Sequence, residues 1–235
     1  VIKEWLSEKK GKAISVTVPK KGERLELLRI AGSNAETIFC TERQSMDTED
    51  VLTETARVLH LTNKPDRIEC FDISNIGGNH AVGSMASFVG GRPWKAGYRR
   101  FRIRTVKEAD DYAMMYEVLN RRFCVKENLP DLIVVDGGKG QLQVAITVLR
   151  DLQVKGVDVI SLAKGGREQH VHKGQDHVYC IGKKNPVYLS RWPDVLFLLQ
   201  RVRDEAHRFA VTYHRKVKHK RDFQSELDAI PGIGP

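Results

Sequence analysis

The sequence has few cysteines and no long apolar run, and both shortages exclude whole classes of protein. Its four cysteines (Cys40, Cys70, Cys124 and Cys180) are scattered without C-x-x-C spacing, which argues against a zinc ribbon or a disulfide framework and favours a reducing cytoplasm. No run of about 18 apolar residues occurs, so no segment is expected to span a membrane. The chain also lacks an initiator Met and a signal-peptide pattern, and we expect a fragment of a longer protein.

Positive charge is what the chain has in excess. Its 235 residues carry a formal net charge of +9, and 41% of them are hydrophobic, enough for one sizeable core. Segment 92–107 contains seven basic residues and no acid. Segment 201–221 contains eight basic residues and only two acids, Asp204 and Glu205. Clustered positive charge favours a polyanionic partner, of which nucleic acid is the commonest; a solvated surface is the alternative.

Hydrophobic periodicity predicts a mixed α/β fold. Residues 1–44 hold a short alternating segment and an amphipathic helix, and another helix is expected over 48–61. Three antiparallel strands then lead into an αβαβ series, a hairpin and a long helix. The expected elements after residue 65 are strands 67–74, 81–91 and 98–106, helix 107–123, strand 131–136, helix 141–152, strand 157–163, hairpin 167–189 and helix 193–216.

Two of these strands end near an acid. Asp72 lies in "RIECFDIS" and Asp136 ends "DLIVVD", and if the two strands are parallel neighbours both carboxylates lie at the same edge of the sheet, where α/β proteins form their sites. Two close carboxylates repel unless a cation lies between them, and Mg²⁺ or Mn²⁺ prefers such oxygen ligands. General acid–base work, or helix capping by each Asp separately, are the alternatives.

The stretch "DGGKGQ" (136–141) does not match a phosphate-binding P-loop. That loop requires G-x-x-x-x-G-K-[ST], whereas here the glycines follow the acid and Gln141 follows "GKG". The glycines are expected to permit a tight turn into a helix beginning near Gln141, with backbone amides open to an anion. Lys139 can contact a phosphate or lie in solvent.

Histidines offer two further candidate ligand sets. His207 lies at the flank of the apolar stripe of the last helix, where a surface or hydrogen-bonded role is the ordinary interpretation; together with two strand-end acids it would complete a two-metal nuclease site. The stripe comprises Val195, Leu199, Val202, Ala206, Phe209, Ala210 and Tyr213. His170, His172, His177 and Cys180 resemble a metal cluster in composition, but no second ligand pair has finger spacing, and we assign no zinc site.

Several motifs together resemble the C-terminal half of the UvrC family of bacterial nucleotide excision repair endonucleases. The resemblance runs from about residue 67 to the end, and residues 1–44 match only loosely. The motifs are "FDISN" (71–75), "YRRFRI" (98–103), "DDYAMMYEVLNRRF" (110–123), "PDLIVVDGGKGQL" (130–142), "LAK" (162–164), "RVRDEAHRFAVTYHR" (201–215) and "IPGIGP" (230–235). Asn75 stands where the family often has His.

This resemblance implies an RNase H-like fold and a metal-dependent Asp-Asp-His site. By motif, Asp72, Asp136 and His207 would be both the catalytic residues and the ligands of Mg²⁺ or Mn²⁺, with Asp110 and Asp111 as supporting acids. The domain would occupy 45–222, between an N-terminal connector segment (1–44) and a linker that starts a truncated helix-hairpin-helix domain (223–235). The implied activity is the incision 5′ to a lesion in DNA.

The implied partners are damaged double-stranded DNA and UvrB, which would dock through a region outside this fragment at a lesion loaded by UvrA, in the bacterial cytoplasm. The alternatives are a non-catalytic DNA-binding scaffold of the same fold and an NTPase built around "DGGKGQ", which the failed P-loop pattern disfavours. Candidates for contacts with the DNA backbone are Arg99, Arg100, Arg102, Lys139, Arg203, Arg208 and Arg215.

Overall fold

The computed structural model describes residues 48–74, 81–106, 110–165 and 176–228, with the side chains of the last helix described as far as Thr212, and scattered residues before Thr48. The chain divides into two units, Val1–Met46 and Asp47–Pro235, and the site lies in the second. The helix expected over 23–39 falls largely outside the described residues, as do His170 and His172.

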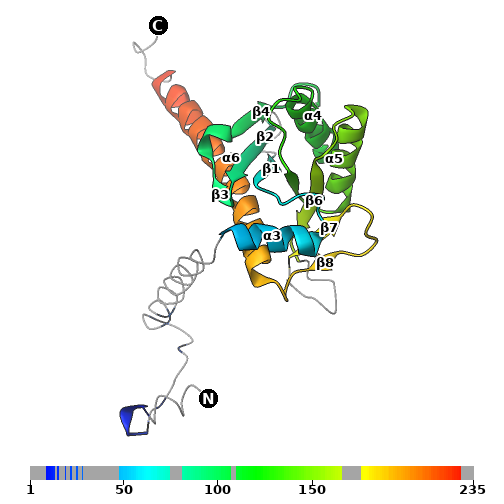
Figure 1. The fold of residues 1–235 in the computed structure, drawn as a ribbon. Helices are drawn as coiled ribbons and strands as arrows, with labels where there is room; N and C mark the ends of the chain where they lie inside the picture. The colour runs from blue at the N-terminus through cyan, green and yellow to red at the C-terminus, as the bar shows by residue number, and fades with distance from the viewer. Residues whose placement is uncertain are drawn as a thin grey trace. The chain divides into compact units, whose positions relative to one another are not determined.

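One mixed sheet forms the centre of the second unit (Figure 1). Its strand order is β3-β2-β1-β5-β6-β7-β8, and β4 also pairs with β2. The strands are β1 (Arg67–Ser74), β2 (Val82–Val89), β3 (Arg92–Pro93), β4 (Arg99–Arg102), β5 (Leu132–Asp136), β6 (Asp158–Ala163), β7 (His177–Cys180) and β8 (Val187–Tyr188).

The pairing of the central strands confirms the predicted topology. Strands β1 and β2 are antiparallel, whereas β1 and β5, and β5 and β6, are parallel. The mixed α/β fold is therefore confirmed. Its parallel pairs are joined by helical crossovers, as parallel neighbours require.

The strand expected over 98–106 is shorter than predicted. Strand β4 ends at Arg102, which pairs with Val82, the first residue of β2. Beyond that point the partner strand has ended, and the amides of Arg104 and Thr105 donate instead to the Glu117 carboxylate (2.9 Å each). The chain can leave the sheet here because the Glu117 carboxylate accepts the hydrogen bonds that a neighbouring strand would otherwise accept.

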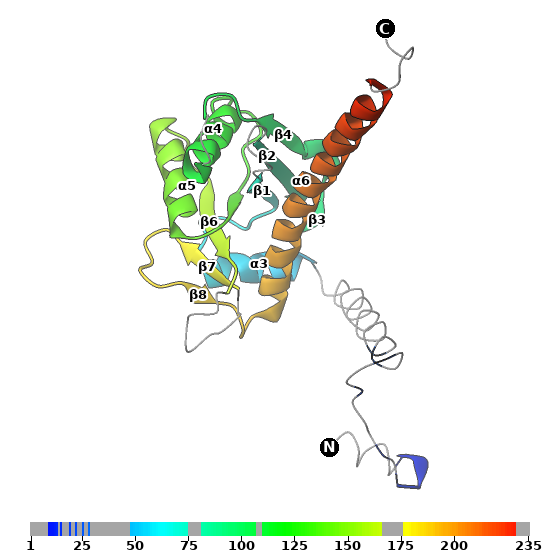
Figure 2. The same cartoon turned by 180° about the vertical axis from the view of Figure 1, so that it is seen from behind.

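Helices cover both faces of the sheet (Figures 1 and 2). Helices α3 (Thr48–Leu59) and α6 (Pro193–Asp228) pack on one face, and α4 (Asp111–Phe123) and α5 (Lys139–Asp151) on the other. Helix α5 begins two residues before the expected start, and α6 continues beyond 216. No helix in the described part of the chain is both long and apolar enough to cross a membrane.

Alternation along the strands sorts their side chains between two cores. On β1, Cys70 belongs to the α3/α6 core and Phe71 to the α4/α5 core, because successive strand residues point to opposite faces. Asp72 therefore lies on the α6 face. Tyr112 of α4 is 51% exposed, because its ring lies against Gly140 at the start of α5 rather than under the sheet.

Candidate metal centre

Asp72 and Asp136 lie next to each other on two parallel strands, Asp136 at the end of β5 and Asp72 two residues before the end of β1. The register of β1 and β5 pairs Phe71 with Val135, and one residue further along each strand stand the two aspartates. Each aspartate lies two residues after a core residue of the α6 face, Asp72 after Cys70 and Asp136 after Val134. The alternation of a strand therefore projects both carboxylates toward α6. The prediction that the two acids meet is confirmed.

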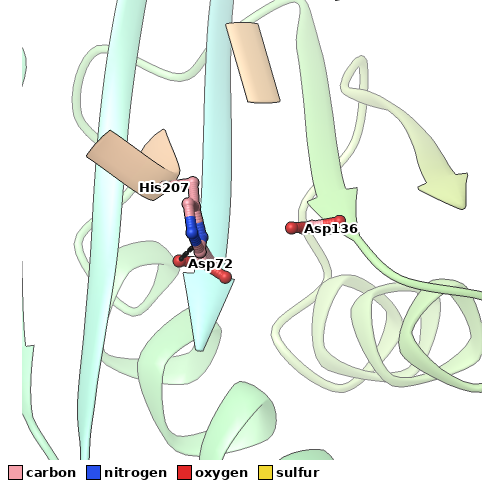
Figure 3. A group of neighbouring side chains, drawn as sticks. All are labelled: Asp72, Asp136 and His207. Carbon is pink, nitrogen blue, oxygen red and sulfur yellow. Dashed lines mark ion pairs between the residues drawn. The ribbon is translucent and has the colours of Figure 1, made fainter. Parts of the chain in front are cut away.

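His207 reaches these acids from α6. Its Nδ1 lies 3.4 Å from Oδ2 of Asp72, and Figure 3 shows its ring beside Asp72, with Asp136 across from them. The helix is anchored at this point because the buried Ser84 hydroxyl, on β2, donates to the carbonyl oxygen of Ala206 (3.2 Å). Ala206 itself is fully buried. A small residue under the helix lets α6 approach the sheet closely enough for His207 to meet Asp72.

The three side chains form a set of donors suited to a divalent cation. One ligand atom from each lies within 4.8 Å of the others, and this is the only such group found among the described residues. Asp72 is nearly buried, while the His207 side chain is 54% exposed, so the group is open to solvent on one side. Ser74 Oγ donates to Asp72 Oδ2 (3.0 Å) and helps to orient that carboxylate.

The charge balance of the group also fits a cation. Burial raises the pKa of Asp136, and the negative charge of Asp72 raises it further, against opposing contributions from Arg203, Lys164 and His207. A carboxylate held in this way is costly to ionise. A divalent ion between the two acids would remove that cost, and carboxylate oxygens with an imidazole nitrogen are suitable ligands for such an ion. The residues present therefore fit a metal.

Arg203 supports the group from one turn earlier in α6. Its guanidinium is buried and donates to Asp176 (2.7 Å) and Asp204 (3.0 Å), and Gln200 also donates to Asp176 (2.9 Å). These bonds tie α6 to the residue that precedes β7. Arg203 was expected to contact DNA; its buried side chain forms ion pairs that hold α6 in place, and the DNA contact stays a prediction. Neither Asp176 nor Ser84 carried a signal in the sequence, because each acts only through contacts between distant segments.

The glycines after Asp136 shape the turn into α5. Gly137 has φ +141°, and a side chain there would meet Gln141, whose Oε1 accepts a hydrogen bond from the amide of Gly138 (3.1 Å). Gly140 lies against the ring of Tyr112. The Lys139 ammonium donates to the carbonyl of Lys184 (2.7 Å), so in this structure it is directed toward the β7–β8 connection.

The remaining predicted residues lie around this group without joining it. Asp110 caps α4 by accepting from the amides of Tyr112 and Ala113 (3.0 Å each), and Asp111 is exposed. Neither belongs to the three-residue group, and their supporting role stays a prediction. His177 of the predicted hairpin is buried beside the rings of Tyr179 and Tyr188.

The basic candidates differ in how open they are. Arg99, Arg100 and Arg102 are exposed on β4. Arg208 is exposed but forms a two-bonded ion pair with Glu205 (2.6 and 2.7 Å). The side chain of Arg215 lies outside the described residues.

Comparison with known families matches most of the chain. Residues 56–211 match the model described as "UvrC RNAse H endonuclease domain", and residues 1–42 match "UvrC Ribonuclease H-like domain". A relative from Syntrophus aciditrophicus, "UvrABC system protein C", is 60% identical over all of this chain, and one of the same name from Geobacter metallireducens is 50% identical over 99% of it. The chain spans 39% of the length of each of these relatives.

Solved structures resemble the chain only weakly. The catalytic domain of human Endonuclease V has a TM-score of 0.40 and 14% identity, and covers 72% of this chain and 96% of its own. The Bacillus subtilis Endonuclease V has a TM-score of 0.38 and 13% identity, with 71% and 91% covered. Similarity at this level adds nothing to the assignment.

Proposed function

The chain belongs to the UvrC family, and we propose that it is the part of a nucleotide excision repair protein that cleaves DNA with a divalent metal held by Asp72, Asp136 and His207. One observation carries the proposal. Residues from a strand, a neighbouring strand and a distant helix bring three ligand atoms within 4.8 Å of one another, in a region of the chain that matches a family named for its endonuclease domain.

The three residues would contribute to metal binding in different ways. Asp72, nearly buried and hydrogen-bonded by Ser74, would be a ligand with a fixed orientation. Burial and the charge of Asp72 raise the pKa of Asp136, so a bound cation would stabilise the ionised form of Asp136. His207 would complete the set from the solvent side. Asp72, Asp136 and His207 would hold Mg²⁺ or Mn²⁺, whose positive charge would polarise the phosphate and favour ionisation of a nucleophilic water.

The reaction is hydrolysis of a phosphodiester. Water adds to phosphorus, the bond from phosphorus to the 3′ oxygen breaks, and the products carry a 5′-phosphate and a 3′-hydroxyl. By holding the metal, Asp72, Asp136 and His207 would help to align the phosphate and the attacking water with the leaving oxygen, and positioning of this kind accounts for much of the catalysis of phosphoryl transfer.

The finer features of the proposal follow from family membership. The substrate would be damaged double-stranded DNA, and the cut would fall on the 5′ side of the lesion. UvrB would be the partner that presents this DNA, through a part of the full-length protein outside this chain. Mg²⁺ or Mn²⁺ would be the ion.

A nicking assay tests the proposal. Supercoiled plasmid is incubated with the chain and Mn²⁺, with and without EDTA, and the conversion to nicked circles is followed. We expect nicking that requires the metal and falls at least about a hundredfold in Asp72→Asn, Asp136→Asn and His207→Ala, since each removes a ligand or its charge. Asp50→Asn, an exposed acid of α3 far from the group, is the matched control and should retain the wild-type rate.

Two results would contradict the proposal. Nicking that survives all three substitutions would show that another site or a contaminant cleaves the DNA. DNA binding by the wild-type chain without any metal-dependent nicking would favour the alternative, a scaffold that keeps the fold but performs no reaction.

A further inference from the structure

The motif "LAK" (162–164) lies at the end of strand β6, beside the metal centre. Leu162 pairs with Asp136 in the parallel register of β5 and β6, and its carbonyl accepts from the Gly137 amide (3.1 Å). Lys164 follows two residues later. Because neighbouring strands lie about 4.8 Å apart and each residue advances the chain by about 3.3 Å, the backbones of Asp136 and Lys164 are about 8 Å apart. The flexible four-carbon stem of a lysine can span much of such a gap.

The residue opposite Lys164 shows which face of the sheet this position occupies. Strands β6 and β7 are antiparallel, and Ala163 pairs with His177, so the next opposite positions are Lys164 and Asp176. Opposite residues of antiparallel strands project to the same face. The Asp176 carboxylate accepts a hydrogen bond from Arg203 of α6 (2.7 Å). Both positions therefore face α6, as Asp136 does.

Helix α6 does not separate Lys164 from the metal centre. Arg203 and His207 are four residues apart and share one side of the helix. On that side Arg203 meets Asp176, and His207 lies beside Asp72. The strand order β1-β5-β6-β7 places Lys164 between these two acids. The lysine and the metal centre thus lie along the same side of α6.

The Lys164 ammonium is available to a ligand. Lys164 is exposed, and among the described residues it has no hydrogen-bond or ion-pair partner. Its charge nevertheless acts on the site. Burial raises the pKa of Asp136, and the charge of Asp72 raises it further. Three positive charges oppose this rise, those of Arg203, Lys164 and His207.

We infer that the Lys164 ammonium donates a hydrogen bond to a non-bridging oxygen of the phosphate that is cleaved. The inference rests on the proposed function, which brings that phosphate to the metal centre. As water adds to phosphorus, negative charge grows on the non-bridging oxygens, and a donor already in place stabilises it. Lys164 keeps its proton throughout. It approaches the phosphate from β6, whereas His207 approaches the metal centre from α6.

The first test measures Mn²⁺ binding in the absence of DNA. Titration calorimetry compares the wild-type chain with Lys164→Met, which keeps an unbranched side chain and removes the charge. Because a positive charge near the ligands repels the ion, we expect the affinity of Lys164→Met for Mn²⁺ to rise about threefold. Loss of a metal ligand, or damage to the site, would lower that affinity.

The second test measures plasmid nicking at saturating Mn²⁺. We expect the rate of Lys164→Met to fall about a hundredfold, the usual cost of removing one donor to a developing negative charge. Lys164→Arg, which keeps the charge but changes the shape of the donor, should lose only about tenfold. Tighter binding of Mn²⁺ together with slower nicking identifies a cation that acts on the phosphate.

Lys155→Met is the matched control. Lys155 is exposed and precedes β6 (Asp158–Ala163), so it lies at the opposite end of this strand from Lys164. Its substitution removes the same charge from the chain. We expect the wild-type affinity for Mn²⁺ and the wild-type nicking rate. Unfolding temperatures of all the variants establish that each one folds.

Two results would overturn the inference while the nuclease assignment stands. Nicking by Lys164→Met at the wild-type rate would show that Lys164 does not act on the phosphate. Slower nicking with an Mn²⁺ affinity no higher than that of the wild-type chain would show that Lys164 supports the fold or the metal ligands instead. A wild-type chain that does not nick DNA with Mn²⁺ would overturn the nuclease assignment and this inference together.

Discussion

The Nδ1 atom of His207 lies 3.4 Å from Oδ2 of Asp72. This contact joins the long helix α6 to the central strand β1, and it occurs where β1 is paired on one side with the strand that carries Asp136 and on the other with the strand that carries Ser84. The metal centre therefore depends on how closely α6 is held against the sheet.

Removing the charge of Asp136 should stabilise the metal-free chain and abolish its stabilisation by Mn²⁺. Asp136→Asn abolishes the repulsion between two partly buried carboxylates, and we expect the metal-free variant to unfold at a higher temperature than the wild-type chain. The wild-type chain should in turn be stabilised by Mn²⁺, by about 2.7 kcal/mol at a hundredfold excess over Kd, and the variant should lose that gain. Thermal unfolding with and without Mn²⁺ measures both effects; an equal response of both proteins to Mn²⁺ would exclude Asp136 as a ligand.

The Ser84 hydroxyl should contribute both to the stability of the chain and to its affinity for Mn²⁺. Ser84→Ala removes the bond to the Ala206 carbonyl that anchors α6 beside His207, and we expect a loss of about 1 kcal/mol in stability together with a severalfold weaker affinity for Mn²⁺. Ser87→Ala is the matched control, since the buried Ser87 Oγ has no hydrogen-bond partner among the described residues. That variant should be as stable as the wild-type chain or more so, with unchanged metal affinity. Urea unfolding and Mn²⁺ titration calorimetry give the two numbers.

The three glycines after Asp136 should respond differently to substitution. Gly137→Ala should be strongly destabilising, because φ is +141° and Gln141 occupies the space. Gly140→Ala should cost less, since the atoms that it meets belong to the half-exposed ring of Tyr112, which can move. Gly138→Ser should be neutral or stabilising by a few tenths of a kcal/mol, because Gly138 is the N-cap of α5 with open space around it. Unfolding temperatures in any other order would contradict this account of the turn.

Glu117 should make the stability of the chain depend on pH. Burial raises its pKa, but the bonds from Thr105, Arg104 and Arg121 outweigh that effect and hold the pKa below the usual 4.5. Its stabilising contribution is therefore complete above pH 4.5 and is lost as pH falls through the lower pKa of the folded state. Glu117→Gln should cost about 1–3 kcal/mol near pH 7 and progressively less as the solution is acidified. Urea unfolding across this range tests the sign, with the exposed Glu127→Gln as the control; a difference that grows on acidification would contradict it.

The parts of the fold that follow from backbone patterning could be predicted. Alternation and apolar runs located the central strands, and the two acids were expected to meet because parallel strands bring their carboxyl ends to one edge. His207 was different: its spacing placed it only at the flank of an apolar stripe, and its role came from the resemblance to a family.

Side-chain contacts between distant segments could not be predicted. The burial of Arg203 depends on Asp176, which precedes β7, and the position of Tyr112 depends on Gly140 at the start of another helix. Local patterns carry no information about such pairs. The end of β4 likewise depends on where its partner strand stops and on Glu117, a residue of the following helix.

The most direct test of the central claim is the position of a bound Mn²⁺. Crystals of the chain grown with Mn²⁺ would give an anomalous difference map that locates the ion independently of activity. We predict a peak at ligand distance from carboxylate oxygens of Asp72 and Asp136 and from a ring nitrogen of His207. A map with no peak among these residues, at an Mn²⁺ concentration that supports nicking, would contradict the account.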